Sequence, residues 1–133
     1  MIYDMTTLKD QILSKPVKIV LIEDNVEVAK WIKDKISEFG NLELAAISNT
    51  YNGAFEMIKS EEPQLVILDL KLPDGNGINI LKKIRNAKLN ITVMVLSLNV
   101  QAKNVCLRLG ADYFFDKNTG TDILLENLKY YNS

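Results

Sequence analysis

Short apolar runs alternate along the chain with longer stretches in which apolar residues recur every three or four positions. The runs predict buried strands within residues 17–22, 42–47, 65–68, 91–96 and 112–116. The recurring positions predict amphipathic helices near residues 26–39, 51–58, 77–84, 102–109 and 124–128. The second strand has a weaker apolar pattern and a more polar character, which is typical of a strand at the edge of a sheet.

This order is a strand followed by a helix, repeated five times. Strands that are separated by helices pair in parallel through right-handed crossovers, and the helices then cover both faces of the sheet. The predicted fold class is therefore α/β, a flavodoxin-like, doubly wound (βα)5 arrangement with a five-stranded parallel sheet in the order 2-1-3-4-5.

Residues 1–16 precede the first unit and are predicted to form an N-terminal extension, with one domain over residues 17–133. Two interpretations of the extension stay open. Its apolar positions Ile2, Met5, Leu8 and Ile12 could line a short helix that ends at Pro16, or the segment could be a frayed terminus.

Composition narrows the function classes. With 133 residues and a net charge of −1, the chain fits one domain without the basic excess that nucleic-acid binding requires. No run is long and apolar enough for membrane insertion. The single cysteine, Cys106, cannot form an internal disulfide, which fits the reducing cytoplasm, the location we expect. The absence of histidine excludes hydrolases with a histidine base and metal sites that contain histidine.

Polar side chains gather where the predicted strands end. The residues at these ends are Glu23, Asp24, Asp69, Ser97, Asp116 and Lys117. For each residue alone, a helix cap or a turn is the more common interpretation. Together they are expected at the carboxyl edge of the sheet, where open parallel sheets bind ligands.

A cluster of carboxylates without histidine or thiolate ligands suits Mg²⁺. Glu23, Asp24 and Asp69 would repel one another unless a cation joined them, and Lys117 adds a positive charge suited to a phosphate. A carboxylate placed like Asp69 can act as a nucleophile toward phosphorus. The residues thus predict phosphoryl transfer, which depends mostly on positioning and charge stabilisation.

Four segments carry a resemblance to a known family: VKIVLIEDN, LVILDLKLPDGNG, VMVLSLN and GADYFFDKN. With these motifs, residues 17–131 resemble the receiver domain of two-component response regulators. Five functional positions in the right order on the right strands are much more specific than a single short motif.

The resemblance implies a role for each position. Asp69 would accept a phosphoryl group from a histidine kinase or a phosphotransfer protein. Mg²⁺ would be bound by Asp24, Asp69 and the backbone carbonyl of Lys71, with Glu23 acting mainly through water. Ser97 and Lys117 would bind the phosphoryl group.

The resemblance also implies a conformational switch, in which Ser97 moves toward the phosphate and Phe114 turns inward. The readout surface would include Lys103, Leu107, Tyr113 and Tyr130, on the fourth helix, the fifth strand and the fifth helix. Its partner would be a downstream protein, or a fused output domain if the chain is part of a longer regulator. A homodimer is a further alternative.

Two positions depart from the family's pattern. Asn118 follows Lys117 where the family usually has proline. A cis bond there would cost ~3 kcal/mol, so we expect a trans bond or an altered loop. Leu98 follows Ser97 where the family usually has a small residue, and it is expected to crowd the phosphate and slow phosphorylation and hydrolysis.

The residues also bear on two other function classes, a binding module and an enzyme. A receiver-like interaction module that is not phosphorylated would have a degraded acidic site, but here the site is intact. Phosphatases with an aspartyl nucleophile commonly have a second Asp two residues later, where this chain has Lys71. The segment EDNVEV lacks the glycine-rich turn of dinucleotide-binding enzymes. We therefore expect a phosphoacceptor that assists its own phosphorylation and dephosphorylation, and not an enzyme.

Overall fold

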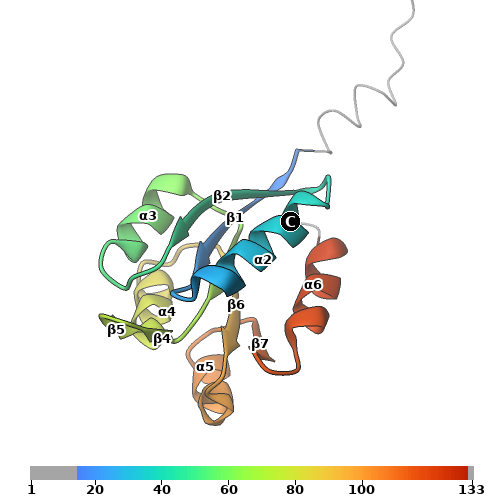
Figure 1. The fold of residues 1–133 in the computed structure, drawn as a ribbon. Coiled ribbons are helices and arrows are strands. Elements are labelled where there is room, and N and C mark those ends of the chain that lie inside the picture. Colours follow the sequence, from blue (N-terminus) through green and yellow to red (C-terminus); the bar gives the residue numbers. More distant parts are fainter. Residues whose placement is uncertain (1–14, 132–133) are drawn as a thin grey trace, which may run out of the picture.

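The computed structural model describes residues 15–131, which form a parallel sheet flanked by helices (Figure 1). The sheet contains β1 (Val17–Ile22), β2 (Leu42–Ser48), β3 (Leu65–Leu68), β6 (Thr92–Ser97) and β7 (Tyr113–Asp116). All neighbours pair in parallel, in the order β2-β1-β3-β6-β7. Since β6 and β7 are the fourth and fifth strands of this sheet, the predicted order 2-1-3-4-5 is confirmed.

Helices cover both faces of the sheet, as a doubly wound fold requires. The helices are α2 (Val26–Ser37), α3 (Ala54–Glu61), α4 (Gly77–Asn86), α5 (Lys103–Arg108) and α6 (Thr121–Lys129). Buried residues of α2 and α6 belong to one hydrophobic core, and those of α3, α4 and α5 belong to the other. The sheet therefore lies between two separate cores.

Strand β1 shows how the sequence produces this layering. Successive side chains of a strand point to opposite faces. Ile19 and Leu21 accordingly join the core under α2 and α6, whereas Val20 and Ile22 join the core under α3, α4 and α5. All four are fully buried, and each contributes about 1.5–3 kcal/mol of burial free energy.

Several predicted boundaries differ from the structure. The helix predicted near residues 51–58 begins only at Ala54, because Gly53 at its N-cap has a φ of 83°. The helix predicted near residues 102–109 begins with a 3₁₀ turn, Val100–Ala102, before α5. Periodicity does not distinguish a tightened first turn from the helix that follows it.

The loop after β3 contains a small hairpin that the sequence did not predict. Strands β4 (Lys71–Leu72) and β5 (Gly75–Asn76) pair antiparallel. Two-residue strands are too short to show periodicity. The Asn76 side chain then accepts a hydrogen bond from the Ile78 N–H at 2.9 Å and caps α4.

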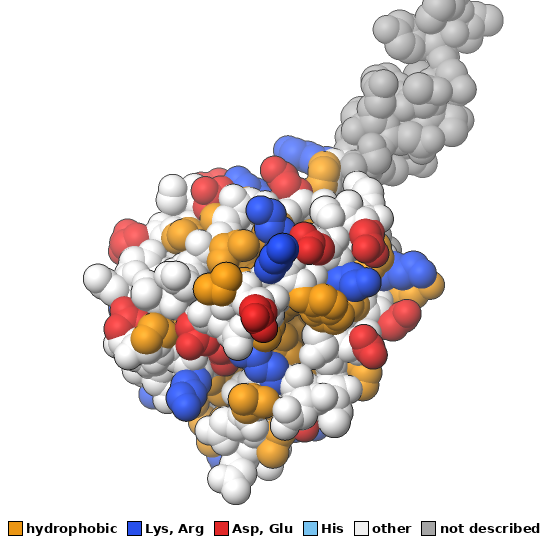
Figure 2. All heavy atoms as spheres, viewed as in Figure 1, with side chains coloured by type: hydrophobic (Ala, Val, Ile, Leu, Met, Phe, Trp, Pro, Cys, Tyr) orange, Lys and Arg blue, Asp and Glu red, His pale blue; other side chains and the backbone are white. Residues whose placement is uncertain are grey.

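The interpretations of the N-terminal extension concern residues 1–14 above all, and these lie outside the described residues. Among residues 15–131, no helix has the length and apolar character needed to cross a membrane. On the face seen in Figure 2, acidic and basic side chains are interspersed, without an extended area of one charge.

Candidate functional site

The site lies at the carboxyl ends of the central strands. Asp69 directly follows β3, and its N–H donates to the carbonyl of Ile22 at 2.9 Å. The N–H of Lys117 donates to the carbonyl of Ser97, also at 2.9 Å. The backbone hydrogen bonding between strands thus continues to Asp69 and Lys117 and fixes the backbone positions of these two residues.

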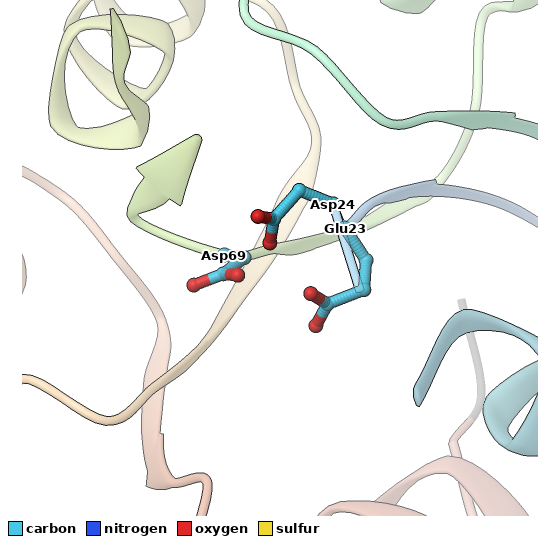
Figure 3. A group of neighbouring side chains, drawn as sticks. All are labelled: Glu23, Asp24 and Asp69. Carbon is cyan, nitrogen blue, oxygen red and sulfur yellow. The ribbon is translucent and has the colours of Figure 1, made fainter. Parts of the chain in front are cut away.

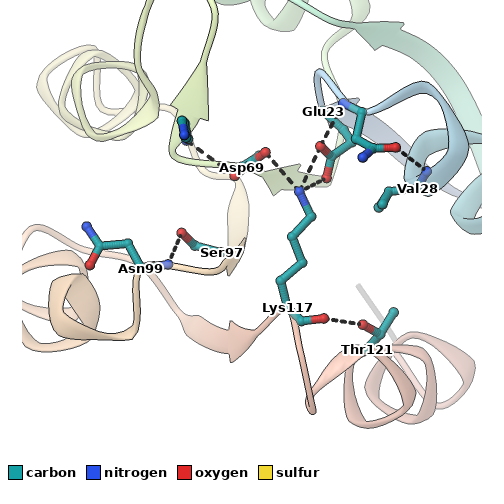
Figure 4. A network of polar contacts seen from close by, with 9 residues as sticks. Glu23, Val28, Asp69, Ser97, Asn99, Lys117 and Thr121 are labelled. Atoms are coloured by element: carbon teal, nitrogen blue, oxygen red, sulfur yellow. Dashed lines mark hydrogen bonds and ion pairs between the residues drawn. The ribbon is translucent and has the colours of Figure 1, made fainter.

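Lys117 joins two of the carboxylates (Figure 4). Its Nζ lies 2.8 Å from Oε1 of Glu23 and 3.0 Å from Oδ2 of Asp69. Burial alone would lower the pKa of Lys117, but the hydrogen bonds to both carboxylates outweigh it, and the pKa is raised. Thr121 donates to the Lys117 carbonyl at 3.2 Å and helps to hold the backbone at the base of this side chain.

Three carboxylates converge at this end of the sheet (Figure 3). Oxygens of Glu23, Asp24 and Asp69 all lie within 4.8 Å of one another. Glu23 is 1% exposed and Asp69 is 4% exposed, whereas Asp24 is open to solvent. Burial raises the pKa of Glu23 to about 7, with Lys117 opposing the shift and the charge of Asp69 adding to it.

A cleft of about 690 Å³ opens above this cluster. Predicted site residues that line it are Asp24, Asp69, Lys71, Ser97 and Lys117. Leu98 also lines the cleft and is 59% exposed. The buried Glu23 does not line the cleft, but its carboxylate pairs with Lys117, which does.

The other predicted residues take up different positions. Ser97 is the last residue of β6, and its Oγ accepts a hydrogen bond from the Asn99 N–H at 3.1 Å. The Lys71 N–H donates to Oδ1 of Asp69 at 3.3 Å. Phe114 does not line the cleft but is half-buried in β7 against the core under α3, α4 and α5.

The donor set fits Mg²⁺. The cluster offers carboxylate oxygens and neither nitrogen nor sulfur ligands, which is the hard oxygen environment that this ion prefers. Asp24 and Asp69 line the cleft, whereas Glu23 does not. Direct binding by Asp24 and Asp69, and binding through water by Glu23, stay predictions. A metal ligand from the Lys71 carbonyl stays a prediction.

Sequence reasoning missed Asn25, which also lines the cleft. Its N–H donates to Oε2 of Glu23 at 3.1 Å, and its side chain accepts from the Val28 N–H at 3.0 Å. An asparagine directly before a helical pattern is a common N-cap signal, and this signal could have identified it. The expected trans geometry before Asn118 is confirmed, since the described residues contain no cis peptide bond.

The chain is similar to known proteins over most of its length. The family model described as the response regulator receiver domain matches residues 19–129. The chain is 32% identical over 112 residues to the probable C4-dicarboxylate response regulator DctR of Bacillus subtilis, covering 84% of this chain and 46% of that protein. It is 28% identical over 116 residues to the nitrate/nitrite response regulator NarL of Escherichia coli, covering 86% and 54%. The chain thus spans about half the length of these relatives.

Solved structures show the same fold. The BeF3-activated N-terminal receiver domain of RstA from Klebsiella pneumoniae aligns with a TM-score of 0.74 and 26% identity, over 84% of this chain and 95% of that one. The signal receiver domain of the putative response regulator NarL from Mycobacterium tuberculosis aligns with a TM-score of 0.76 and 20% identity, over 88% and 99%.

Proposed function

The chain belongs to the response regulator receiver domain family, and we propose that it accepts a phosphoryl group on Asp69 in a Mg²⁺-dependent reaction. One observation carries the proposal: Asp69 lies in a cleft, in contact with Lys117 and within 4.8 Å of two further carboxylates. A purely structural ion pair would need neither the open cleft nor the additional acidic groups.

The chemistry follows from this arrangement. A carboxylate oxygen of Asp69 attacks the phosphorus of a phosphohistidine, a P–O bond forms, and the P–N bond to the donor imidazole breaks. Lys117 and the Ser97 hydroxyl bind the oxygens of the transferred group and stabilise its charge. Mg²⁺, when bound by Asp24 and Asp69, supplies further positive charge to these oxygens.

Signal output would follow from a local rearrangement. We assign Ser97 and Phe114 as the switch residues, because Ser97 lines the cleft and Phe114 lies on the adjacent strand against the core under α5. The responding surface would consist of α5, β7 and α6, which are the predicted fourth helix, fifth strand and fifth helix. This surface exposes Leu107, Tyr113 and Tyr130.

The proposed partners follow from the reaction. Upstream, the phosphoryl donor is a histidine kinase or a phosphotransfer protein, and the proposed location is the cytoplasm. Downstream, the target is a separate protein or an output domain, since DctR and NarL are about twice as long as the matched region. Within this chain, residues 17–133 form the proposed receiver domain, and residues 1–16 form the proposed extension.

One observation favours a second candidate function. Leu98 is 59% exposed at the cleft, where a large side chain restricts the space available to a phosphoryl group. If this restriction prevented phosphorylation, the chain would serve as a receiver-like interaction module without phosphate.

Intact-protein mass after incubation with acetyl phosphate separates the two functions. We expect a gain of one phosphoryl group that requires Mg²⁺ and is absent in Asp69→Asn. A phosphohistidine protein serves as a second donor. No gain from either donor would favour the interaction module, and a Leu98→Ala variant that then accepted phosphate would identify the obstructing side chain.

A further inference from the structure

A carboxylate outside the acidic cluster connects two loops near the cleft. Asp74, in the turn between β4 and β5, accepts hydrogen bonds from two successive backbone N–H groups, those of Tyr51 and Asn52. The second of these bonds measures 2.8 Å. Both donors belong to the connection between β2 and α3, so Asp74 joins segments that are more than twenty residues apart. These two bonds also lower the pKa of Asp74.

The same two loops are packed together by an aromatic ring. A Cβ atom on Gly75 would lie 2.6 Å from Cγ of Tyr51, so the ring rests directly on the glycine backbone. Lys83, on α4, also contacts this ring: its Nζ lies 5.1 Å from the centroid of the Tyr51 ring. We call Tyr51, Asn52, Asp74 and Gly75 the clasp.

The hairpin held by the clasp reaches the phosphoacceptor. Its first residue, Lys71, donates its N–H to Oδ1 of Asp69 at 3.3 Å and pairs with Asn76. Its next residue, Leu72, is buried and pairs with Gly75. Leu72 thus anchors the hairpin in the core, and the clasp anchors its turn. Three residues of the hairpin also line the cleft: Lys71, Gly75 and Asn76.

We propose that Asp74 is a positioning residue for the phosphoacceptor site, holding the β4–β5 hairpin so that Lys71 orients Asp69 and the adjoining metal site. This inference rests on the proposed function. Asp74 is exposed and lies outside both cores, so its two hydrogen bonds act on the placement of the loop. A two-residue hairpin is weak by itself, and fixing it before the metal binds removes an ordering cost from binding.

Two variants open the clasp by different means. Asp74→Ala removes both hydrogen-bond acceptors. Gly75→Ala keeps them but forces a methyl group against the Tyr51 ring. Gly75 does not require a positive φ, so this substitution acts through the contact alone.

Asp112→Ala is the matched control. The Asp112 carboxylate also joins separate segments, accepting from the Val93 N–H at 2.8 Å and from Arg85 at 3.0 Å. It lies at the opposite ends of the strands from the cleft, since Val93 is near the start of β6. Its loss should lower stability without affecting the cleft.

The experiment measures two quantities on all four proteins. Hydrogen exchange of the Lys71 amide, followed by NMR without metal, reports on the hairpin. Calorimetric titration with Mg²⁺ reports on the site. We expect faster Lys71 exchange and about tenfold weaker Mg²⁺ binding in both clasp variants, the usual effect of losing a group that supports metal ligands. Asp112→Ala should match the wild type in both.

Different results contradict the role of Asp74 and the proposed function. Unchanged Lys71 exchange in Asp74→Ala overturns the inference, and so does faster exchange with unchanged Mg²⁺ affinity. A wild-type chain that does not bind Mg²⁺ contradicts the proposed function instead, and Lys71 exchange alone then decides whether the clasp holds the hairpin.

Discussion

At the scale of single residues, Lys117 lies between two carboxylates that are almost completely shielded from solvent. Its own side chain is 12% exposed, against 1% for Glu23 and 4% for Asp69. Buried charges are tolerated only when they are paired, so each of the three depends on the others. The same pairing that stabilises these buried charges also places a cation beside the proposed phosphoacceptor.

The first prediction concerns this pairing. Lys117→Ala should fold but lose about 3 kcal/mol of unfolding free energy, because it leaves buried carboxylates without their cation. Mg²⁺ should stabilise this variant more than it stabilises the wild type, since the ion replaces part of the lost charge. Urea unfolding with and without Mg²⁺ measures both effects, and phosphorylation of the variant should produce little switching.

Lys103→Ala is the matched control, because Lys103 is exposed on α5 and makes no ion pair with the described residues. A Lys117→Ala variant with the stability of this control would show that the ion pairs contribute nothing measurable.

The second prediction concerns the pH dependence of stability. The pKa of Glu23 rises from its usual 4.5 to about 7 on folding, first because of burial. Between these values the folded chain keeps a proton on Glu23 that the unfolded chain has lost. The contribution of Glu23 to the free energy of unfolding is therefore largest below pH 4.5. It decreases as the pH rises from 4.5 to about 7 and is constant above that.

Comparison with Glu23→Gln isolates this contribution, because the amide does not titrate. Without metal, the unfolding free energy of the wild type relative to the variant should decrease as pH rises from about 4.5 to 7. Denaturant unfolding across this range measures the difference. A difference that does not change with pH would mean that Glu23 has an ordinary pKa in the folded chain.

At the scale of elements, α4 begins against the backbone of the proposed phosphoacceptor. A Cβ atom on Gly77, the first residue of α4, would collide with the carbonyl oxygen of Asp69 and lie 2.9 Å from Cα of Leu70. The glycine thus permits the close approach of helix and strand end, and it explains why this position has no side chain.

The third prediction follows from this contact. Gly77→Ala should lower the unfolding free energy by about 1–3 kcal/mol, the usual cost of inserting atoms into a packed contact, and should reduce phosphorylation. Gly40→Ala is the control, since a Cβ atom there would meet nothing within 4 Å. Equal stability of the two variants in urea would contradict the proposed packing constraint.

The fourth prediction concerns signal transmission through β7. Phe114→Ala should still be phosphorylated, but the amide resonances of α5 should no longer shift when Mg²⁺ and a phosphoryl analogue are added. Phe55→Ala is the matched control, because Phe55 is also half-buried against the same core but belongs to α3. Shifts of α5 that persist in Phe114→Ala would exclude Phe114 as the switch residue.

Elements differ in how well the sequence predicts them. The strand β3 was evident because it is a continuous apolar run, and α4 because its buried residues recur at helical spacing. The β4–β5 hairpin was not, because two-residue strands have no detectable period. Its geometry depends instead on the bonds from Asp74 to Tyr51 and Asn52, which join positions that the sequence gives no reason to connect.

At the scale of the whole molecule, the clustering of the candidate site residues could be predicted, because the topology of the sheet places them at one edge. Parallel strands with the order β2-β1-β3-β6-β7 place all their carboxyl ends at one edge. Residues at those ends therefore meet even though Glu23 and Lys117 are 94 positions apart. The tertiary distances within the cluster, and the burial of Glu23 beside an exposed Asp24, required the structure.

The central claim is that Asp69 is the phosphoacceptor, and mapping the modified residue tests it most directly. After treatment with acetyl phosphate and Mg²⁺, borohydride reduces an aspartyl phosphate to homoserine, and peptide mass spectrometry then identifies the position. We predict homoserine at Asp69 alone, and none when Mg²⁺ is omitted. Homoserine at Asp24 or Asp74 with an unmodified Asp69 would contradict the account.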